Sequence, residues 1–309
     1  MTNVAGLMII VMILHHLAFV SLVKVTDYVF IFFMAWFLFK SGMFAEKDRQ
    51  KKISNFILYI FKKLLLPYVI LIVTSLIIGI LLEYCYSGYF NLGGDLKGCL
   101  YEILNLGTIV WNGSLWFLLT LFLVKIVSKI CDGGIWRHVC ICLLGLFISY
   151  LLYKMPYSLP LYLGNTALGL FFYHLGYLLR KRQYGRWQWC VSCIGYVLIL
   201  CFFDVDFDFW SNKANPYQIT IVALIAGCVA INNVFKKFVF LQNRFLKYVG
   251  NNAMPFYTIH GILLYVLSYL NAHFFHIGMG YAFFLLNIVV LSIALPLYAF
   301  IYNHNKLQQ

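Results

Sequence analysis

Long apolar runs dominate the chain, and short polar or charged clusters separate them. Runs of about 18 to 20 residues are the length that a helix needs to cross roughly 30 Å of hydrocarbon. Helices are favoured because unpaired backbone groups are costly in lipid and because the runs are too long for barrel strands. The pattern predicts ten membrane-spanning helices, at residues 4–23, 26–44, 64–82, 114–131, 137–154, 160–179, 187–203, 216–234, 253–271 and 279–302.

The connections between these runs are short and contain no soluble domain. The two longest cover residues 45–63 and 83–113. The first has the pattern of an amphipathic helix that lies along the cytoplasmic interface before Pro67 opens the third span. We therefore expect one domain over residues 1–309, of the all-α class, built as a polytopic transmembrane helix bundle.

Composition supports a membrane protein. The chain is 63% hydrophobic and 11% charged, whereas soluble domains are roughly 45–50% apolar and about 25% charged. A chain of this composition cannot cover itself with polar surface, so a soluble fold is excluded.

The basic residues predict the orientation. If the N-terminus is cytoplasmic, 18 of the 23 Lys and Arg residues fall in inside segments, Lys40 falls within a span, and only Lys24, Lys97, Lys154 and Lys213 fall outside. The positive-inside rule then places both termini in the cytoplasm of a multi-pass protein of the cell membrane. The net charge of +13 is explained by anionic lipid headgroups and does not require nucleic acid.

Two cysteines fall in the first large outside loop. An oxidising compartment could join Cys85 and Cys99 in a disulfide, although both could also remain free. The other cysteines lie mostly within spans, where they act as small hydrophobic residues.

Few polar side chains fall within the spans, where each costs at least about 2.5–3.5 kcal/mol. They are His15, His16, Lys40, Ser41, His174, Asn251, Asn252 and His260. Adjacent residues on a helix point about 100° apart, so His15 and His16 cannot both face one partner. A functional role is favoured for His16, whereas a neutral ring bonded to a neighbouring helix is favoured for the other histidines. Lys40 could either extend to the cytoplasmic interface or bind an anionic ligand.

The polar residues restrict the chemistry. Metal binding is only a weak alternative, because no pair of His, Cys or carboxylate residues has ligand spacing on one helix apart from the adjacent histidines. The chain also lacks a phosphate-binding loop, a serine nucleophile elbow and a carboxylate pair. If the protein is an enzyme, a histidine general base is the simplest chemistry available.

Six separated motifs resemble the type 3 integral-membrane acyltransferases, which O-acetylate sugars and cell-surface polysaccharides and include fucose O-acetylase-like proteins. They are the first helix from Gly6 to His16, the aromatic run 32–42 ending in Ser41 and Gly42, the basic and Pro-Tyr segment 62–68, the Leu-Trp-Phe segment 114–118, the Phe-rich segment 171–179 and the late segment 248–260. Together they cover nearly the whole chain in the order of the family.

The chain departs from the family pattern at two places. Ala5 stands where a basic residue precedes the glycine of the first helix, and Trp36 and Leu38 stand where phenylalanines are usual. Lys40 could replace the missing positive charge. A catalytically inactive member of the family is the reading that Ala5 supports.

The resemblance implies an O-acyltransferase that moves an acetyl group from cytoplasmic acetyl-CoA to a sugar hydroxyl of a cell-envelope glycan. His16 would be the general base; Lys40, Ser41, Lys62 and Lys63 would bind the donor; and Trp36, Trp116, Asn251 and His260 would line the acceptor pocket. The acidic and aromatic run 204–210 suits a sugar, although a solvated loop is the simpler interpretation. A transporter or flippase of a lipid-linked glycan or small solute is the competing class.

Overall fold

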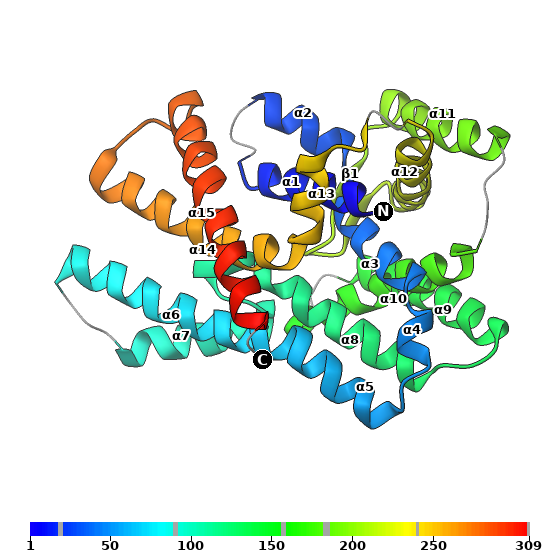
Figure 1. Cartoon of the computed structure of the whole chain (residues 1–309), viewed down its shortest axis with the longest axis horizontal. Coiled ribbons are helices and arrows are strands. Elements are labelled where there is room, and N and C mark those ends of the chain that lie inside the picture. The colour runs from blue at the N-terminus through cyan, green and yellow to red at the C-terminus, as the bar shows by residue number, and fades with distance from the viewer. Residues whose placement is uncertain (18–20, 89–91, 156–158, 182–185, 239–240, 308–309) are drawn as a thin grey trace.

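The computed structural model describes residues 1–17, 21–88, 92–155, 159–181, 186–238 and 241–307. Most of them are helical, as Figure 1 shows. The α-helices are α1 Thr2–His15, α2 Ser21–Val29, α3 Phe33–Met43, α4 Glu46–Arg49, α5 Ile53–Ile60, α6 Leu66–Ser87, α7 Leu92–Leu106, α8 Trp116–Ile130, α9 Ile135–Lys154, α10 Leu163–Leu179, α11 Arg186–Phe202, α12 Tyr217–Lys237, α13 Arg244–Asn251, α14 Ala253–Leu270 and α15 Tyr281–Leu307. The remaining elements are the π-helical turns η1 Phe61–Leu65 and η5 Asn271–Phe275, the 3₁₀ turns η2 Val110–Leu115 and η3 Pro160–Tyr162, and the strands β1 Asp206–Asp208 and β2 Lys213–Asn215.

The helices form the bundle that the apolar runs predict, and helix occupies part of every predicted span. Within the described residues, six helical stretches are long and apolar enough to cross a membrane: Ile53–Ser87, Gly93–Ile130, Ile135–Lys154, Tyr217–Lys237, Ala253–Phe275 and Tyr281–His304. Thr2–His15 and Trp187–Phe202 are shorter apolar helices. The polytopic helical fold is confirmed, whereas ten crossings remain a prediction.

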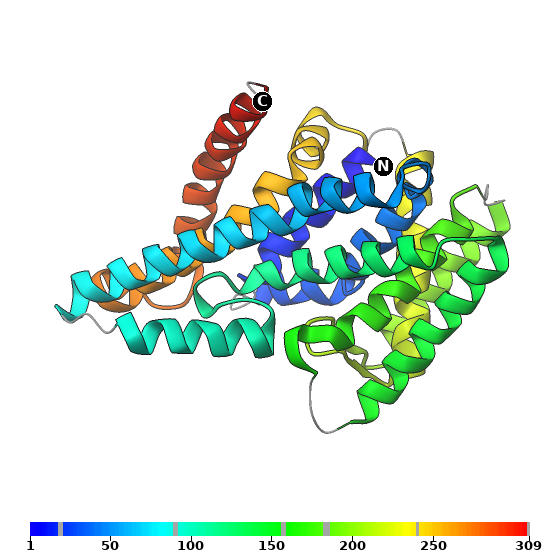
Figure 2. The ribbon, with the colours of Figure 1, turned by 90° about the horizontal axis from the view of Figure 1, so that it is seen from below.

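The bundle has a centre and two ends. Helices α1, α3 and α13 lie in the middle of Figure 1, α6, α7, α14 and α15 extend to one end, and α9 to α12 form the other. The start of α1 and the end of α15 lie toward the same side of the molecule in Figure 2.

The predicted interfacial helix and the third span form one helical stretch, Ile53–Ser87. The π turn η1 joins α5 to α6, and the N–H of Leu66 donates to the carbonyl of Phe61, five residues back. Pro67 follows at once and has no N–H to donate, so a widened turn accommodates it without ending the helix. The expected boundary before residue 64 is therefore wrong.

The first two predicted spans are interrupted. Helix α1 ends at His15, and helices α2 and α3 are separate, so continuous helices over 4–23 and 26–44 are not formed; residues 18–20 lie outside the described part of the chain. The end of a helix leaves carbonyl groups without helical partners. In hydrocarbon such an end is tolerated where it lies against protein or lines a cavity, and the end of α1 lines a cavity.

Glycines bring the central helices together. A Cβ atom on Gly42 of α3 would lie 1.8 Å from the carbonyl oxygen of Tyr173, and one on Gly176 of α10 would lie 2.0 Å from that of Phe39. In lipid, small residues favour helix association because they let backbones approach closely. The Ser-Gly and Gly-Tyr motifs of the sequence are therefore packing features of the α3–α10 pair.

The predicted outer segments are more ordered than loops. Segment 83–113 contains helix α7, and segment 203–216 contains the antiparallel hairpin β1–β2, in which Phe207 pairs with Ala214. Cys85 is exposed, Cys99 is buried, and both are free thiols. The proposed disulfide is therefore not formed in the structure.

Candidate functional site

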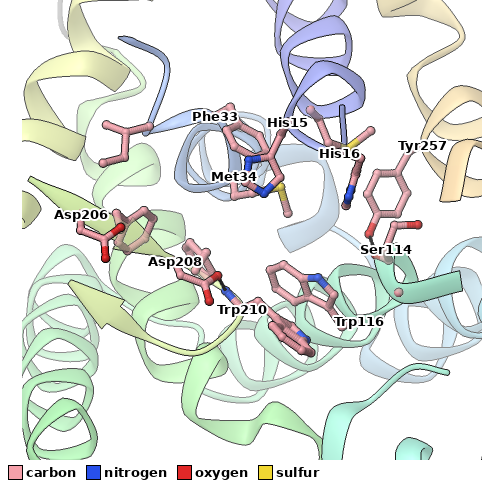
Figure 3. Close-up of a pocket in the computed structure, with 15 residues that line it drawn as sticks. His15, His16, Phe33, Met34, Ser114, Trp116, Asp206, Asp208, Trp210 and Tyr257 are labelled. Carbon is pink, nitrogen blue, oxygen red and sulfur yellow. Dashed lines mark hydrogen bonds between the residues drawn. The ribbon is translucent and has the colours of Figure 1, made fainter. Parts of the chain in front are cut away.

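A cavity of about 510 Å³ lies where α1 ends, and Figure 3 shows it in close-up. Ligand pockets commonly have volumes of about 300–1,000 Å³. Its walls come from α1, the start of α3, the η2–α8 junction, the β1 hairpin and α14. Segments far apart in the sequence therefore meet at one place.

The end of α1 supplies two imidazole rings to the cavity. His15 and His16 both line it and are both exposed, and their ring centroids are 5.4 Å apart with a 71° angle between the planes. In Figure 3 the His15 ring lies beside Phe33 and Met34, whereas the His16 ring lies on the side of Tyr257. The two rings therefore have different neighbours, as the helical angle between adjacent residues requires.

His260 of α14 lies next to His16, with ring centroids 5.2 Å apart. Its side chain is fully buried, and Nδ1 lies 2.6 Å from the carbonyl oxygen of Tyr257. Tyr257 itself lines the cavity, and its hydroxyl donates to the carbonyl of Ser114. The late motif and the first-helix motif of the sequence thus meet at His16.

A polar cluster holds the non-helical turn η2 against α14. The turn passes through Asn112, whose backbone is non-helical at φ −153° and ψ 67°. Its Oδ1 accepts from Ser114 Oγ at 2.9 Å, and its Nδ2 donates to Ser75 Oγ of α6 at 3.3 Å. Gly261 leaves the required space, since a Cβ there would lie 2.2 Å from Asn112 Oδ1. These contacts fix Ser114 at the cavity wall.

Sequence reasoning missed Asn112. It falls just before the predicted fourth span, where an asparagine reads as a loop residue. The only available signal was the sequence Trp-Asn-Gly-Ser at the start of an apolar run, which marks a turn without indicating that the turn is buried.

The hairpin supplies the acidic and aromatic wall. Asp206, Asp208 and Trp210 line the cavity, and Trp116 stacks on Phe209 with centroids 6.0 Å apart and planes at 23°. Asp208 is engaged within the hairpin, because its carboxylate accepts from the Trp210 N–H at 2.9 Å and from Ser211 Oγ at 2.6 Å. Among the described residues that line the cavity, none is Lys or Arg, so the wall carries net negative charge.

Two predicted pocket residues lie elsewhere. Trp36 is fully buried, and its Nε1 donates to Asn232 Oδ1 at 2.9 Å, so it joins α3 to α12. Asn251 is exposed at the end of α13, whereas its neighbour Asn252 is buried and accepts from Asn303 Nδ2 at 2.7 Å. Neither Trp36 nor Asn251 is among the residues lining this cavity.

The predicted donor residues do not line the cavity. Lys40 and Ser41 lie in the last turns of α3. Burial, with a smaller effect of the charges of Lys40 and Lys236, lowers the pKa of the Met1 amino group, at the opposite end of α1 from His16. The 14 residues of α1 span about 20 Å. Any donor held near Lys40 would therefore have to reach along the length of α1.

The other two predicted donor residues lie on η1 and are exposed. Lys63 Nζ donates to the hydroxyl of Tyr59 at 2.9 Å. Lys40 and Ser41 lie on α3, so two different elements carry the four predicted donor residues.

His174 lies in a second histidine pair away from the cavity. Its Nδ1 lies 2.9 Å from His138 Nδ1, and its Nε2 lies 3.1 Å from Ser128 Oγ. The structure therefore bonds His174 to the two neighbouring helices α9 and α8, which is the structural role expected for most of the histidines.

Comparison with protein families gives one full-length match. A family model described as an acyltransferase domain, of the type 3 class, matches residues 5–301. Comparison with curated proteins and with solved structures gave no match.

Proposed function

Because the chain belongs to the type 3 acyltransferase family, we propose that it is a membrane O-acyltransferase that moves an acetyl group from cytoplasmic acetyl-CoA to a sugar hydroxyl of a cell-envelope glycan. The observation that carries the proposal is the cavity in which His16 faces an aromatic and acidic wall. A general base on one side and a surface suited to sugars on the other are the two parts that this transfer needs.

In the proposed reaction, His16 takes the proton of the acceptor hydroxyl while the hydroxyl oxygen attacks the thioester carbonyl of acetyl-CoA. The C–S bond then breaks, the acetyl group remains on the sugar oxygen, and the leaving CoA thiolate takes up the proton that His16 holds, which restores the neutral base. The thioester already carries a good leaving group. Positioning of the two substrates and one base can therefore supply much of the rate.

The acceptor would occupy the hairpin side of the cavity. The ring faces of Trp116 and Trp210 can stack on a sugar ring, and the carboxylate of Asp206 can accept hydrogen bonds from sugar hydroxyls. The exposure of Asp206 leaves it accessible to a ligand from the cavity. This placement favours a role in acceptor binding over the solvated loop that was the simpler interpretation of the sequence.

The donor would approach from the other end of α1. The nucleotide part of acetyl-CoA is polyanionic, and Lys40, Lys236, Lys62 and Lys63 supply positive charge on the side that the topology assigns to the cytoplasm. The pantetheine arm would extend along α1 to bring the thioester to His16. Ala5 is uncharged and fully buried, so in this proposal the positive charge comes from these lysines.

One assay separates this proposal from a transporter and from an inactive family member. Purified protein is incubated with acetyl-CoA labelled in the acetyl group and with envelope glycan of the cells that carry the protein. The proposal requires label in the glycan and release of one CoA for each acetyl group transferred. A transporter or an inactive family member would give neither product. Absence of label from the glycan together with absence of released CoA would therefore reject the proposed reaction.

We expect Asp206→Ala to raise the KM for the acceptor about tenfold, with kcat and the KM for acetyl-CoA nearly unchanged. One hydrogen bond to a charged group contributes about 1.5–3 kcal/mol, and the lower value corresponds to about a tenfold change in affinity. The matched control is Asp204→Ala, because Asp204 is exposed on the same connection and does not line the cavity. Equal KM values for the two variants would remove Asp206 from the acceptor site.

The proposed orientation places β2 outside and the start of α5 inside. Lys213 and Lys52 are both exposed and suit cysteine labelling, whereas neighbouring Asn212 is buried. In intact cells, Lys213→Cys should react with an impermeant maleimide more than the parent protein does, and Lys52→Cys should react only after lysis. The reverse pattern would invert the topology and place the acceptor cavity on the cytoplasmic side.

A further inference from the structure

The hydrogen bond of His260 defines which of its nitrogens carries the proton. Nδ1 lies 2.6 Å from the Tyr257 carbonyl oxygen, and a carbonyl can only accept, so Nδ1 must be the N–H donor. In the neutral ring Nε2 is then a bare acceptor. Nε2 is buried and has no hydrogen-bond partner among the described residues. Leaving such an acceptor unpaired costs about 1–3 kcal/mol.

The polar group placed to satisfy this acceptor is the imidazole of His16. The ring centroids of His16 and His260 are 5.2 Å apart. In the second histidine pair, His138 and His174, a centroid separation of 5.0 Å accompanies a nitrogen–nitrogen distance of 2.9 Å. The His16 and His260 rings thus lie at nearly the separation at which the other pair makes its nitrogen–nitrogen contact.

We propose that His260 is a positioning residue for His16: its bare Nε2 accepts the N–H of the His16 ring and leaves the other His16 nitrogen unprotonated toward the cavity. This inference rests on the proposed role of His16 as general base. It assigns His260 a different role from the acceptor-pocket residue that the sequence suggests, because its fully buried side chain acts through His16 and not on the sugar.

The hydrogen bond has two consequences for the reaction. It selects one of the two neutral tautomers of His16, so that in the neutral ring the nitrogen facing the acceptor hydroxyl is unprotonated and can take a proton. It also remains in place when His16 becomes positively charged, because the cationic ring still donates to Nε2. In many enzymes a base activates the nucleophile, and a third group orients the base through a hydrogen bond. His260 would be that third group here.

The test measures acetyl transfer from acetyl-CoA to isolated envelope glycan for three full-length variants, His260→Leu, His260→Gln and Asn287→Leu. The leucine removes the acceptor, and we expect kcat to fall about 10²-fold with both KM values within about twofold. The amide oxygen of glutamine can accept the His16 N–H, so His260→Gln should recover at least tenfold over leucine. Recovery by glutamine distinguishes positioning from simple packing.

Asn287→Leu is the matched control for loss of a buried polar group. Asn287 is fully buried in α15, its Nδ2 donates to the carbonyl of Phe283 at 2.7 Å, and its Oδ1 has no partner among the described residues. It does not line the cavity. We expect its kcat to stay within about twofold of the parent value. A large loss in this variant would mean that any buried substitution lowers kcat, and would overturn the assignment.

The double variant His16→Ala/His260→Leu separates positioning from an independent catalytic role. If His260 acts through His16, the double variant should be no slower than His16→Ala, because groups that act as a unit are non-additive. Losses that multiply would overturn the proposal. A normal rate for His260→Leu in a protein that His16→Ala inactivates would reject this inference alone, whereas a normal rate for His16→Ala would reject the proposed function as well.

If neither substitution at His260 yields folded protein, the unsubstituted protein provides the test. The ring ¹⁵N shifts of His16, assigned by their loss in His16→Ala, report its tautomer at neutral pH. A single neutral tautomer is the expected result. A mixture of the two tautomers would mean that no acceptor orients the ring, and would overturn the proposal.

Discussion

His16→Ala should lower the turnover of acetyl transfer by roughly 10²–10⁴-fold, the usual contribution of a positioned general base. The ring lines the cavity opposite the hairpin wall, so its removal takes away the proton acceptor and leaves the donor region at the other end of α1 intact. Equilibrium binding of acetyl-CoA should therefore remain close to that of the parent protein.

His15→Ala is the control for this prediction, because the two residues share the end of α1 and the same cavity. The His15 ring lies 5.5 Å from that of Phe33, on the side away from Tyr257 in Figure 3. We expect a much smaller loss, since His16 and not His15 is the ring that lies beside His260. A His16→Ala protein that inserts, folds and transfers acetyl groups at the parent rate would eliminate the mechanism.

The helical fold could be predicted because the hydrocarbon core of the membrane restricts every residue of a span. Hydrocarbon demands apolar side chains and internally bonded backbone over about 20 residues, and both demands are visible in single residues and their order. Helix therefore occupies part of every predicted span. Hydropathy does not show whether an apolar run forms one continuous helix. Apolar residues are equally compatible with two helices that are separated by a buried non-helical turn.

The breaks that the sequence did not reveal are the ones that build the site. Helix α1 ends at His15 within a run that remains apolar through residue 23, and η2 interrupts Gly93–Ile130 at Asn112. The η2 interruption is stabilised by distant segments, since the hydroxyl of Tyr257 donates to the carbonyl of Ser114 and Ser75 accepts from the side chain of Asn112. Such pairing depends on tertiary contacts, which a local pattern cannot contain.

The candidate site was predictable only where resemblance selected individual residues. His16, Trp116 and His260 meet around or beside one cavity. Trp36 was selected by the same argument and instead bonds Asn232 within the packed interior. An aromatic motif in a span is consistent with both a pocket wall and core packing, and the difference lies in which side of the helix faces the cavity.

The glycines of the motifs have a common physical role. A Cβ on Gly6 would lie 2.0 Å from the carbonyl oxygen of Leu246, and one on Gly250 would lie 2.0 Å from that of Thr2. Helices α1 and α13 are therefore in backbone contact at two points. Since His16 immediately follows α1, this contact determines where the proposed base lies relative to α14.

Gly6→Val should destabilise the protein and abolish acetyl transfer. The contact at Gly6 is with backbone atoms of α13, so no rotamer change can relieve it and the two helices must separate. Overpacking of well-packed interiors typically costs about 1–3 kcal/mol, and we expect at least the upper value here. At about 2.1 cal/mol/K of unfolding entropy per residue, 3 kcal/mol corresponds to a fall of about 5 °C in the thermal midpoint of this chain. The midpoint is measured as the folded fraction that remains after heating in detergent.

Gly195→Val is the matched control, because Gly195 lies within helix α11 and a Cβ there would meet nothing within 4 Å. The two substitutions share the change in helix propensity and in side-chain size, so their difference isolates the contact with α13. The control should keep its thermal midpoint within about 2 °C of the parent protein and should retain transfer. A Gly6→Val protein with the same midpoint as the control would show that α1 does not lie against α13, and the position of His16 beside His260 would then have no structural support.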